Sequence, residues 1–252
     1  MATKDKMKKS PTFESVKLEG ALGSFSYELT YKKVKNINIR VSGGIVRVSA
    51  PRGTPRERIS RFVLENEAFV LRAVSEQTAR LERKIPTSYA DGGCFYYLGR
   101  ARTLVLARGK SSVRLDGERL LVSLAHPEDE TAVERALVEW ISGETLSLVK
   151  SLCLRHLGEF APHLRAMPAL YVRAMKRRLG SCCPSRASVT FARTLACLPT
   201  ECVEYVVLHE LCHFIFADHS PAFYRELGAR LPNHRALRRH TSEQCEVCFP
   251  SR

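Results

Sequence analysis

Apolar and polar residues alternate along the first third of the chain, which is the pattern of half-buried β-strands. Residues 36–51, NINIRVSGGIVRVSAP, place two alternating runs on either side of Ser42-Gly43-Gly44. Glycine reaches the positive φ angles of a tight turn, so this segment predicts a β-hairpin. A looser alternation in YELTYKK, residues 27–33, predicts another strand before it.

The period of the pattern then changes from two residues to that of a helix. Thr54-Pro55 is a helix-start signal, and apolar residues recur after it at helical spacing, which predicts a helix over residues 55–82. Two further strand-rich segments follow at residues 95–107 and 112–124. The second contains Asp116-Gly117, a strong signal for a two-residue turn.

The second half of the chain mixes helices with two strands. A long amphipathic helix is expected from about Glu128 to His156, with acidic residues in its first turn, where the helix dipole favours them. PALYVRAM, residues 168–175, predicts a strand, and ASVTFAR, residues 187–193, predicts its antiparallel partner. Helices are expected over residues 199–216, 220–230 and 232–243.

This order of elements predicts an α+β fold. We expect a basic flexible tail over residues 1–12, a β-rich N-terminal part with a long helix over residues 13–127, and a C-terminal domain over residues 128–252. The C-terminal domain would contain a small antiparallel sheet and the helix that carries the most unusual motif of the chain.

Composition narrows the class of protein. The 252 residues carry a net charge of +14, which favours anionic partners such as nucleic acid, although a generally basic surface explains it equally well. No apolar run reaches the roughly 18 residues of a membrane-spanning helix, and the basic N-terminus lacks the apolar region of a signal peptide. We therefore expect a cytoplasmic protein with no membrane partner.

The cysteines do not form the pattern of a secreted protein. There are nine, an odd number, and they are scattered, so reduced thiols are expected rather than a disulfide framework. Cys245 and Cys248 have the C-x-x-C spacing of a zinc site, but there is no second pair, so the signal is weak.

The unusual motif lies in VVLHELCHFIFADHS, residues 206–220, where charged and imidazole groups interrupt an apolar run. His209, Glu210 and His213 match H-E-x-x-H. On a helix the two histidines stand one turn apart on one face, from which both can reach a single zinc ion. The adjacent Glu210 is then in position to act as a general base.

His219 follows six residues after His213 and is the expected third ligand, once a turn near Ala217-Asp218 brings it back. Glu226 on the next helix is the alternative to His219 as third ligand. Asp218 either orients an imidazole or has a capping or turn role before the following helix, and we favour the capping or turn role. Three protein ligands leave one position open, as in catalytic zinc sites, so one zinc ion per chain is expected.

Four other side chains are candidates for stabilising a tetrahedral oxyanion. The sequence does not choose among them: Tyr205, Tyr224, His234 and Arg178.

Residues 199–223 resemble the signature of the YgjP-like metallopeptidases, a group related to the WLM and SprT-like zinc proteases. CFYYLGRARTLVL, residues 94–106, and MKRRLGSC, residues 175–182, resemble two further segments of that family. The resemblance implies a zincin-like domain, zinc ligands at His209, His213 and His219, and a catalytic base at Glu210.

Two positions depart from the family pattern: Leu179 stands where the family has tryptophan, and Ala192 where it has asparagine. We expect a zinc metallopeptidase that hydrolyses protein or peptide substrates through a metal-activated water, with residues 188–192 as an edge strand that holds the substrate. One alternative is a SprT-like protease that acts on DNA-bound proteins. The other is a metal-stabilised binding protein with weak catalysis.

Overall fold

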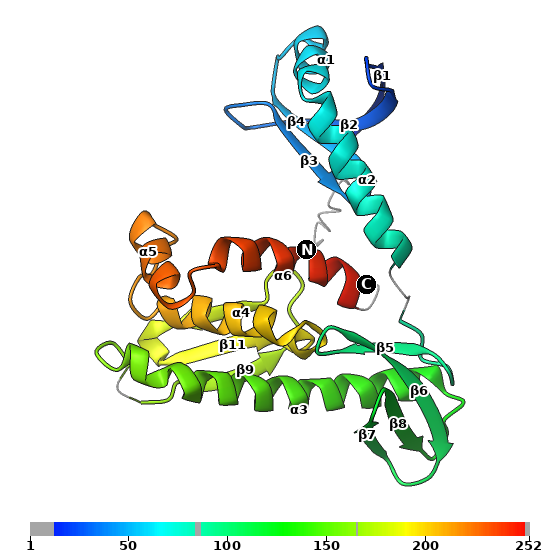
Figure 1. The fold of residues 1–252 in the computed structure, drawn as a ribbon, viewed down its shortest axis with the longest axis vertical. Helices are drawn as coiled ribbons and strands as arrows, with labels where there is room; N and C mark the ends of the chain where they lie inside the picture. The colour runs from blue at the N-terminus through cyan, green and yellow to red at the C-terminus, as the bar shows by residue number, and fades with distance from the viewer. Residues whose placement is uncertain (1–12, 84–86, 165, 250–252) are drawn as a thin grey trace, which may run out of the picture. The chain divides into compact units, whose positions relative to one another are not determined.

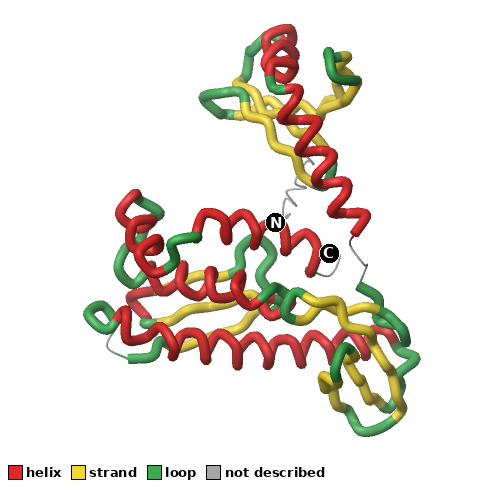
Figure 2. Tube along the Cα trace, in the orientation of Figure 1, coloured by secondary structure: helices red, strands yellow, loops and turns green. Residues whose placement is uncertain are grey.

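The computed structural model of the chain describes residues 13–83, 87–164 and 166–249, which form mixed α and β structure (Figures 1 and 2). The predicted tail over residues 1–12 lies outside the described residues. The chain divides into two compact units, Met1–Lys84 and Ile85–Arg252. Among the described residues, no helix has the length and apolar character needed to cross a membrane.

Unit 1 is a four-stranded sheet followed by two helices. The elements are β1 (Glu14–Glu19), β2 (Ser24–Lys32), β3 (Asn38–Ser42), β4 (Ile45–Pro51), α1 (Arg56–Glu65) and α2 (Glu67–Arg83). The sheet order is β1-β2-β4-β3, with β2 and β4 parallel and the other pairs antiparallel. The predicted hairpin is confirmed, and Gly43 and Gly44 have φ angles of 62° and 74° in its turn.

The single helix predicted over residues 55–82 is wrong, because the helix is interrupted at Asn66. The Asn66 side chain donates a hydrogen bond of 2.8 Å to the carbonyl oxygen of Phe62, which competes with the continuing helical pattern. The apolar faces of sheet and helices still meet in one small core: Tyr27, Leu29, Val46, Val48, Ala50, Ile59, Val63 and Val70.

Unit 2 begins with a sheet that has the same strand order as the sheet of unit 1. Its strands β5 (Cys94–Tyr97), β6 (Arg100–Arg108), β7 (Ser112–Asp116) and β8 (Arg119–Leu124) are ordered β5-β6-β8-β7. Again the two central strands are parallel and the outer pairs antiparallel. The predicted turn at Asp116-Gly117 joins β7 to β8, with a φ angle of 57° at Gly117.

The remaining elements of unit 2 are mostly helical and, apart from β10 and three short 3₁₀ helices, follow the predicted order. They are α3 (Glu130–His156), η1 (Leu157–Phe160), β9 (Ala169–Arg173), β10 (Gly180–Cys183), η2 (Pro184–Arg186), β11 (Ser188–Ala192), η3 (Leu195–Cys197), α4 (Thr200–Cys212), α5 (Pro221–Arg230) and α6 (His234–Cys248). The long helix α3 runs without a break through Gly143 and packs on α4 and β9.

The expected boundary between residues 127 and 128 differs from the division of the chain, which falls after Lys84. The strands β5 to β8 share a hydrophobic core with α3. Leu104, Leu120 and Val122 are fully buried there, in one cluster with Leu137 and Ile141. Alternation along a strand shows which face is apolar but not what covers it, and here the cover is the helix that the sequence assigned to a separate domain.

The small sheet of unit 2 is mixed, so the antiparallel pairing expected for its strands is wrong. Its order is β10-β11-β9, and β11 is parallel to β9 and antiparallel to β10. The short strand β10, Gly-Ser-Cys-Cys, forms the hairpin with β11 through η2. It therefore takes one edge of the sheet, and residues 188–192 form the central strand rather than an edge.

The turn between β5 and β6 is anchored to the segment that precedes α4. The backbone N–H groups of Leu98 and Gly99 donate to the carbonyl oxygens of Ala196 (2.8 Å) and Cys197 (2.9 Å). From α3, the buried Thr145 hydroxyl donates to the carbonyl of Arg193 at 3.0 Å and accepts from Ala196 N–H at 3.1 Å. These bonds fix the start of α4 from two directions.

Replacing Gly99 with alanine should destabilise the protein by about 2–4 kcal/mol. Gly99 has a φ angle of 76°, and an added Cβ would lie 2.6 Å from Cγ of Pro199. Gly117→Ala is the matched control, because its φ is also positive but no atom lies within 4 Å of the added Cβ. Urea unfolding should show that the control loses only about 1 kcal/mol of the free energy of unfolding. Equal losses for the two variants would refute the close approach to Pro199.

Candidate metal centre and its pocket

The helix α4 carries the first part of the motif and is anchored by apolar side chains. Pro199 precedes it, Glu201 lies in its first turn, and Val203, Val207 and Leu211 are fully buried and form a stripe along one face. Burial extends beyond that stripe to Val206 and Leu208, among others, because α4 packs against α3, β10, α5 and α6. Packing against neighbouring elements on several sides therefore fixes the position of α4.

The chain turns sharply after α4, four residues earlier than the predicted helix end at Phe216. His213 is the residue that follows the helix, and its Nδ1 lies 3.0 Å from the carbonyl oxygen of Phe216. A carbonyl only accepts, so Nδ1 carries the proton and Nε2 keeps its lone pair. This hydrogen bond also fixes the orientation of the ring.

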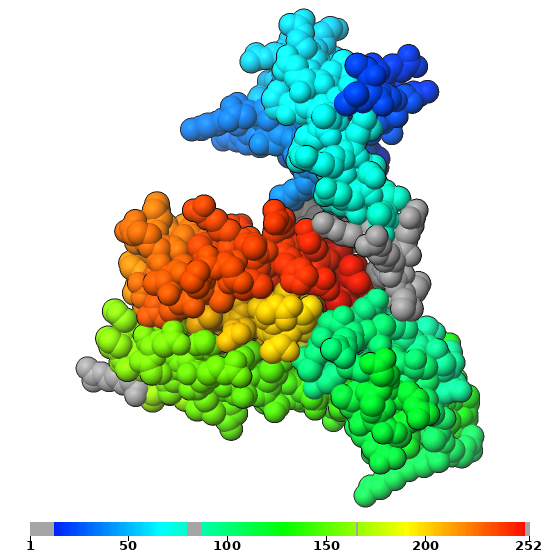
Figure 3. All heavy atoms as spheres, in the orientation of Figure 1, coloured from blue at the N-terminus to red at the C-terminus, as the bar shows by residue number. Residues whose placement is uncertain are grey.

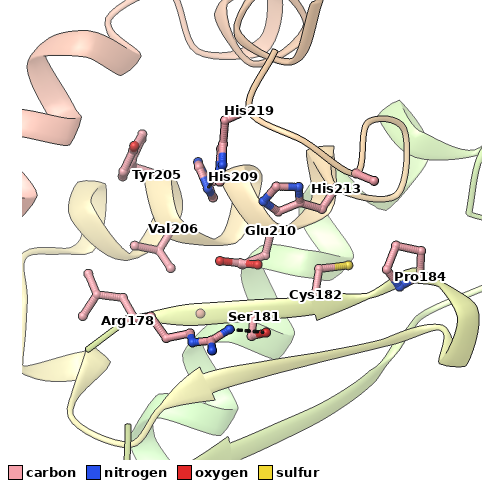
Figure 4. Close-up of a pocket in the computed structure, with 13 residues that line it drawn as sticks. Arg178, Ser181, Cys182, Pro184, Tyr205, Val206, His209, Glu210, His213 and His219 are labelled. Atoms are coloured by element: carbon pink, nitrogen blue, oxygen red, sulfur yellow. Dashed lines mark hydrogen bonds between the residues drawn. The ribbon is translucent and has the colours of Figure 1, made fainter. Parts of the chain in front are cut away.

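The structure brings three histidines together. One nitrogen each of His209, His213 and His219 lies within 4.8 Å of the others, and Nε2 of His209 and Nε2 of His219 are 2.9 Å apart. In the part of the chain that the structure describes, this is the one group of three such residues that could hold a metal ion. Figure 4 shows the three rings converging above Glu210.

The turn that returns His219 to α4 is held by its own polar groups. Asp218 Oδ1 accepts from Ser220 N–H at 3.3 Å, and Ser220 Oγ accepts from Phe223 N–H at 3.4 Å as the N-cap of α5. Asp218 therefore has the turn role that we favoured. Glu226, the substitute considered for His219, forms a salt bridge of 2.5 Å with Arg230 and is not in the histidine group.

Phe223 supports the triad from α5, a role that the sequence did not reveal. Its fully buried ring lies 4.8–5.0 Å, centroid to centroid, from the rings of His209, His213 and His219. An aromatic ring in contact with all three limits their rotation. The only signal for it was its place in the family signature.

The electrostatics at His209 and His219 favour neutral imidazoles. Burial lowers the pKa of His209 to about 3, and the neighbouring His213 and His219 add to this. Burial also lowers the pKa of His219, with His213 as the next cause. Neutral imidazole nitrogens are metal ligands, and Nε2 of His209 faces Nε2 of His219 at 2.9 Å, so both nitrogens can bind one ion. The three residues therefore fit a metal ion.

Glu210 lies beside the triad in a buried position. It is 6% exposed, and burial raises the pKa of its carboxyl group to about 7, against the opposing effects of a hydrogen bond from the Cys182 backbone and the charge of Arg178. Gly180 of β10 passes directly over it. A Cβ at that position would lie 2.5 Å from Oε1 of Glu210 and 2.6 Å from its Cγ.

A cavity of about 590 Å³ opens between α4 and β10 and contains the triad and Glu210. Figure 4 shows β10 along one wall and α4 along the other. The lining residues come from these two elements and the segments next to them: Arg178, Leu179, Gly180, Ser181, Cys182, Pro184, Tyr205, Val206, His209, Glu210, His213, Ala217 and His219.

The four candidate oxyanion stabilisers fall into two groups. Arg178 and Tyr205 line this cavity, and Nη1 of Arg178 donates to Ser181 Oγ at 3.1 Å. Tyr224 and His234 line a different cavity, between α5 and α6. Tyr224 still contacts the triad, because its ring stacks on His219 with centroids 6.3 Å apart.

The remaining sequence candidates lie away from the metal centre or only beside it. Cys245 and Cys248 are in α6 and do not belong to the histidine group. Leu179, one of the two departures from the family pattern, lines the cavity. Ala192, the other, is buried at the end of β11, and its N–H donates to the carbonyl of Leu179.

Comparison with known proteins identifies the family. No curated protein matches the chain. A family model described as "YgjP-like, metallopeptidase domain" matches residues 35–244, which is most of the chain and includes both the histidine group and Glu210. A metallopeptidase family implies a hydrolase with a metal cofactor and a protein or peptide substrate. The chain therefore belongs to the YgjP-like metallopeptidase family.

Proposed function

We propose that the protein is a zinc-dependent peptidase in which His209, His213 and His219 hold the metal and Glu210 is the general base. The observation that carries this proposal is the convergence of three histidine nitrogens within 4.8 Å, in the same cavity as a buried carboxyl group. Neither the metal ligands nor the base has to be recruited from elsewhere in the chain.

Zinc suits this donor set better than magnesium or calcium, which prefer oxygen ligands. Three imidazoles leave a fourth position open toward the cavity. Bound there, zinc would supply a Lewis acid that polarises the scissile carbonyl and lowers the pKa of water. The chain's own residues then have to position the peptide and move the proton.

Glu210 has the properties of a proton carrier near neutral pH. A general base works best when its pKa lies close to the working pH, and burial brings the pKa of Glu210 to about 7. It accepts a proton from the attacking water at its carboxylate and then donates this proton to the leaving amine. The backbone N–H of Cys182 and the packing of Gly180 hold the carboxylate in one position.

The edge strand β10 offers a place for the substrate backbone. It replaces β11 in the role first expected for residues 188–192, since β11 is paired on both sides. Gly180, Ser181 and Cys182 of β10 line the cavity, and their outer edge does not pair with another described strand. A peptide that adds to this edge would lie between β10 and α4, next to Glu210.

Arg178 and Tyr205 are the side chains that we assign to the developing oxyanion. Both line the cavity and can donate a hydrogen bond, and burial raises the pKa of Tyr205, so its hydroxyl keeps its proton. Tyr224 and His234 lie in the other cavity and are not assigned this role.

Replacing Gly180 with alanine should lower kcat about tenfold or more and leave the metal content unchanged. The new Cβ would overlap the Glu210 side chain, which supplies its three nearest atoms, so the carboxyl group would have to move. Gly143→Ala in α3 is the control, since its added Cβ meets nothing within 4 Å and alanine favours the helix. A Gly180→Ala enzyme with full kcat would rule out the close packing over the base.

The proposed function is tested by metal analysis together with proteolysis. Purified protein should contain about one zinc ion per chain, and a chelator should abolish cleavage of an unfolded protein such as casein. Added zinc should restore cleavage. Protein that binds zinc but cleaves no protein or peptide would support the alternative of a binding protein with weak catalysis. The DNA-associated alternative remains a prediction, and no observation in the site or the family match favours it.

A further inference from the structure

A second cavity lies between α5 and α6, close to the histidine triad. It measures about 610 Å³ and is lined by Pro221, Tyr224, Arg225, His234, Arg235 and Arg238. The side chains of the two helices form one continuous surface, drawn in orange and red in Figure 3. We call it the arginine cavity. Two of its arginines, Arg235 and Arg238, belong to the basic stretch Arg235–Arg239.

The charge of the arginine cavity is unbalanced. Three of its six lining residues are arginines and none is acidic. Within the described ranges, Arg225, Arg235 and Arg238 form no salt bridge, in contrast to Arg230 on the same helix as Arg225, which pairs with Glu226 and Glu159. Exposed arginines that gather in one hollow without an acidic partner attract a negatively charged group.

Neutral polar groups in the arginine cavity also have bonding capacity to spare. Arg238 Nη1 donates to the Tyr224 hydroxyl at 3.3 Å, which leaves the proton of that hydroxyl for another acceptor. Nδ1 of His234 lies 3.2 Å from the carbonyl of Leu231, while its Nε2 is buried without a partner in the described residues. A buried polar atom without a partner is costly, so a ligand or water that reaches it is favoured.

Tyr224 connects the arginine cavity to the metal centre. Its ring stacks on His219 with centroids 6.3 Å apart and on His234 with centroids 6.2 Å apart. The charge of Arg238 reaches the triad, where it contributes to lowering the pKa of His209 and His219. An extended peptide advances about 3.3 Å per residue, so it covers these two ring-to-ring steps within about four residues.

We propose that the arginine cavity binds a carboxylate of the peptide substrate, from an acidic side chain or from the chain terminus, within about four residues of the cleaved bond. This inference rests on the proposed peptidase function and adds a specificity determinant to it. Guanidinium groups match carboxylates in geometry as well as charge. A hollow lined by six residues of two helices fits one such group, whereas single-stranded nucleic acid needs a basic groove that follows several phosphates.

The test compares matched quenched-fluorescence peptides on the full-length protein. One series replaces glutamate by glutamine at each position near the cleaved bond, and a second replaces the terminal carboxylate by an amide. We expect the wild type to prefer the carboxylate at one position about tenfold in kcat/KM, mainly through KM. The first series identifies a side chain as the source, and the second identifies the chain terminus.

Variants connect that preference to the arginine cavity. In the double variant Arg235→Gln and Arg238→Gln, the ratio of kcat/KM for the carboxylate peptide to kcat/KM for its amide partner should fall to about one. The corresponding pair of lysine substitutions should retain part of the preference, because charge is kept. Arg239→Gln is the matched control, since Arg239 is a neighbour on α6 that does not line the cavity. Equal cleavage of both members of every peptide pair by the wild type, or an unchanged preference in the double glutamine variant, would overturn the proposal.

A binding assay separates this inference from the proposed function. Fluorescence anisotropy of the same peptides, labelled, with the Glu210→Gln protein requires no cleavage. Tighter binding of carboxylate peptides that is lost in the double variant supports the arginine cavity even if no peptide is hydrolysed. Equal binding of acid and amide forms overturns it. Displacement of the peptide by a single-stranded oligonucleotide at lower concentration than by the carboxylate peptide would also overturn it, in favour of phosphate binding.

Discussion

Exchanging Glu210 for glutamine should lower kcat for peptide hydrolysis by about a hundredfold to ten-thousandfold while the metal stays bound. The amide has the shape of the carboxylate and fits the same space against Gly180, but it cannot accept a proton. Because Glu210 is not in the histidine group, the metal keeps all its protein ligands. Steady-state kinetics and zinc analysis of the same preparation measure both parts of this result.

Two controls show that the loss is chemical rather than structural. Burial penalises the charged form of Glu210, so the melting temperature of the glutamine variant should be unchanged or raised. Glu201→Gln removes a carboxylate from the first turn of the same helix, where the side chain is 57% exposed, and should leave kcat intact. Hydrolysis at the wild-type rate in Glu210→Gln would eliminate this residue as the base.

Replacing His213 with alanine should remove the metal and, with it, hydrolysis. One of its ring nitrogens belongs to the group, and Nδ1 is already held by the carbonyl of Phe216, which leaves Nε2 for the metal. Loss of one of three ligands should weaken zinc binding by about a hundredfold or more, since even the loss of supporting groups costs about tenfold to a hundredfold. Zinc per chain after dialysis measures the effect.

A comparison of thermal stability separates metal loss from misfolding. Added zinc should raise the melting temperature of the wild type by binding the native state, and should not raise that of His213→Ala. His126→Ala is the control, because that histidine is 73% exposed in the same unit and pairs only with Glu128 among the described residues. One tightly bound zinc ion in His213→Ala would contradict the assigned ligand set.

Features that depend on neighbouring residues could be predicted from the sequence. The glycine turns at Gly43-Gly44 and Asp116-Gly117 have the required positive φ angles, and α3 and the start of α4 lie where apolar spacing and their first turns predict. The spacing of His209, Glu210 and His213 belongs to this class, because one helical turn sets the distance between the two histidines.

Features that depend on distant residues could not be predicted in the same way. The apolar faces of β6 and β8 were recognised, but their packing against Leu137 and Ile141 of α3 was not, so the unit boundary was placed too late. Gly180–Cys183 has no alternating pattern and was not recognised as a strand. This omission led to the wrong partner for β11 and the wrong edge for the sheet.

The same distinction between neighbouring and distant residues applies to the candidate site. Nothing in the sequence indicates that Gly180 lies against Glu210, or that Phe223 contacts all three histidine rings. Arg178 and Tyr205 could be named as candidates but not separated from Tyr224 and His234. That separation needs the two cavities, one between α4 and β10 and the other between α5 and α6.

The anchoring of α4 has a consequence for the order in which the protein folds. His209 and His219 are ten residues apart, whereas the bonds from Leu98 and Gly99 to the segment before α4 join parts of the chain that are far apart in sequence. Closing a long loop costs more entropy than closing a short one, and contacts between distant residues slow folding. During refolding we therefore expect the histidines to gain metal affinity first. Hydrolysis should return only later, when the hydrogen bonds of the β5–β6 turn hold α4 beside β10.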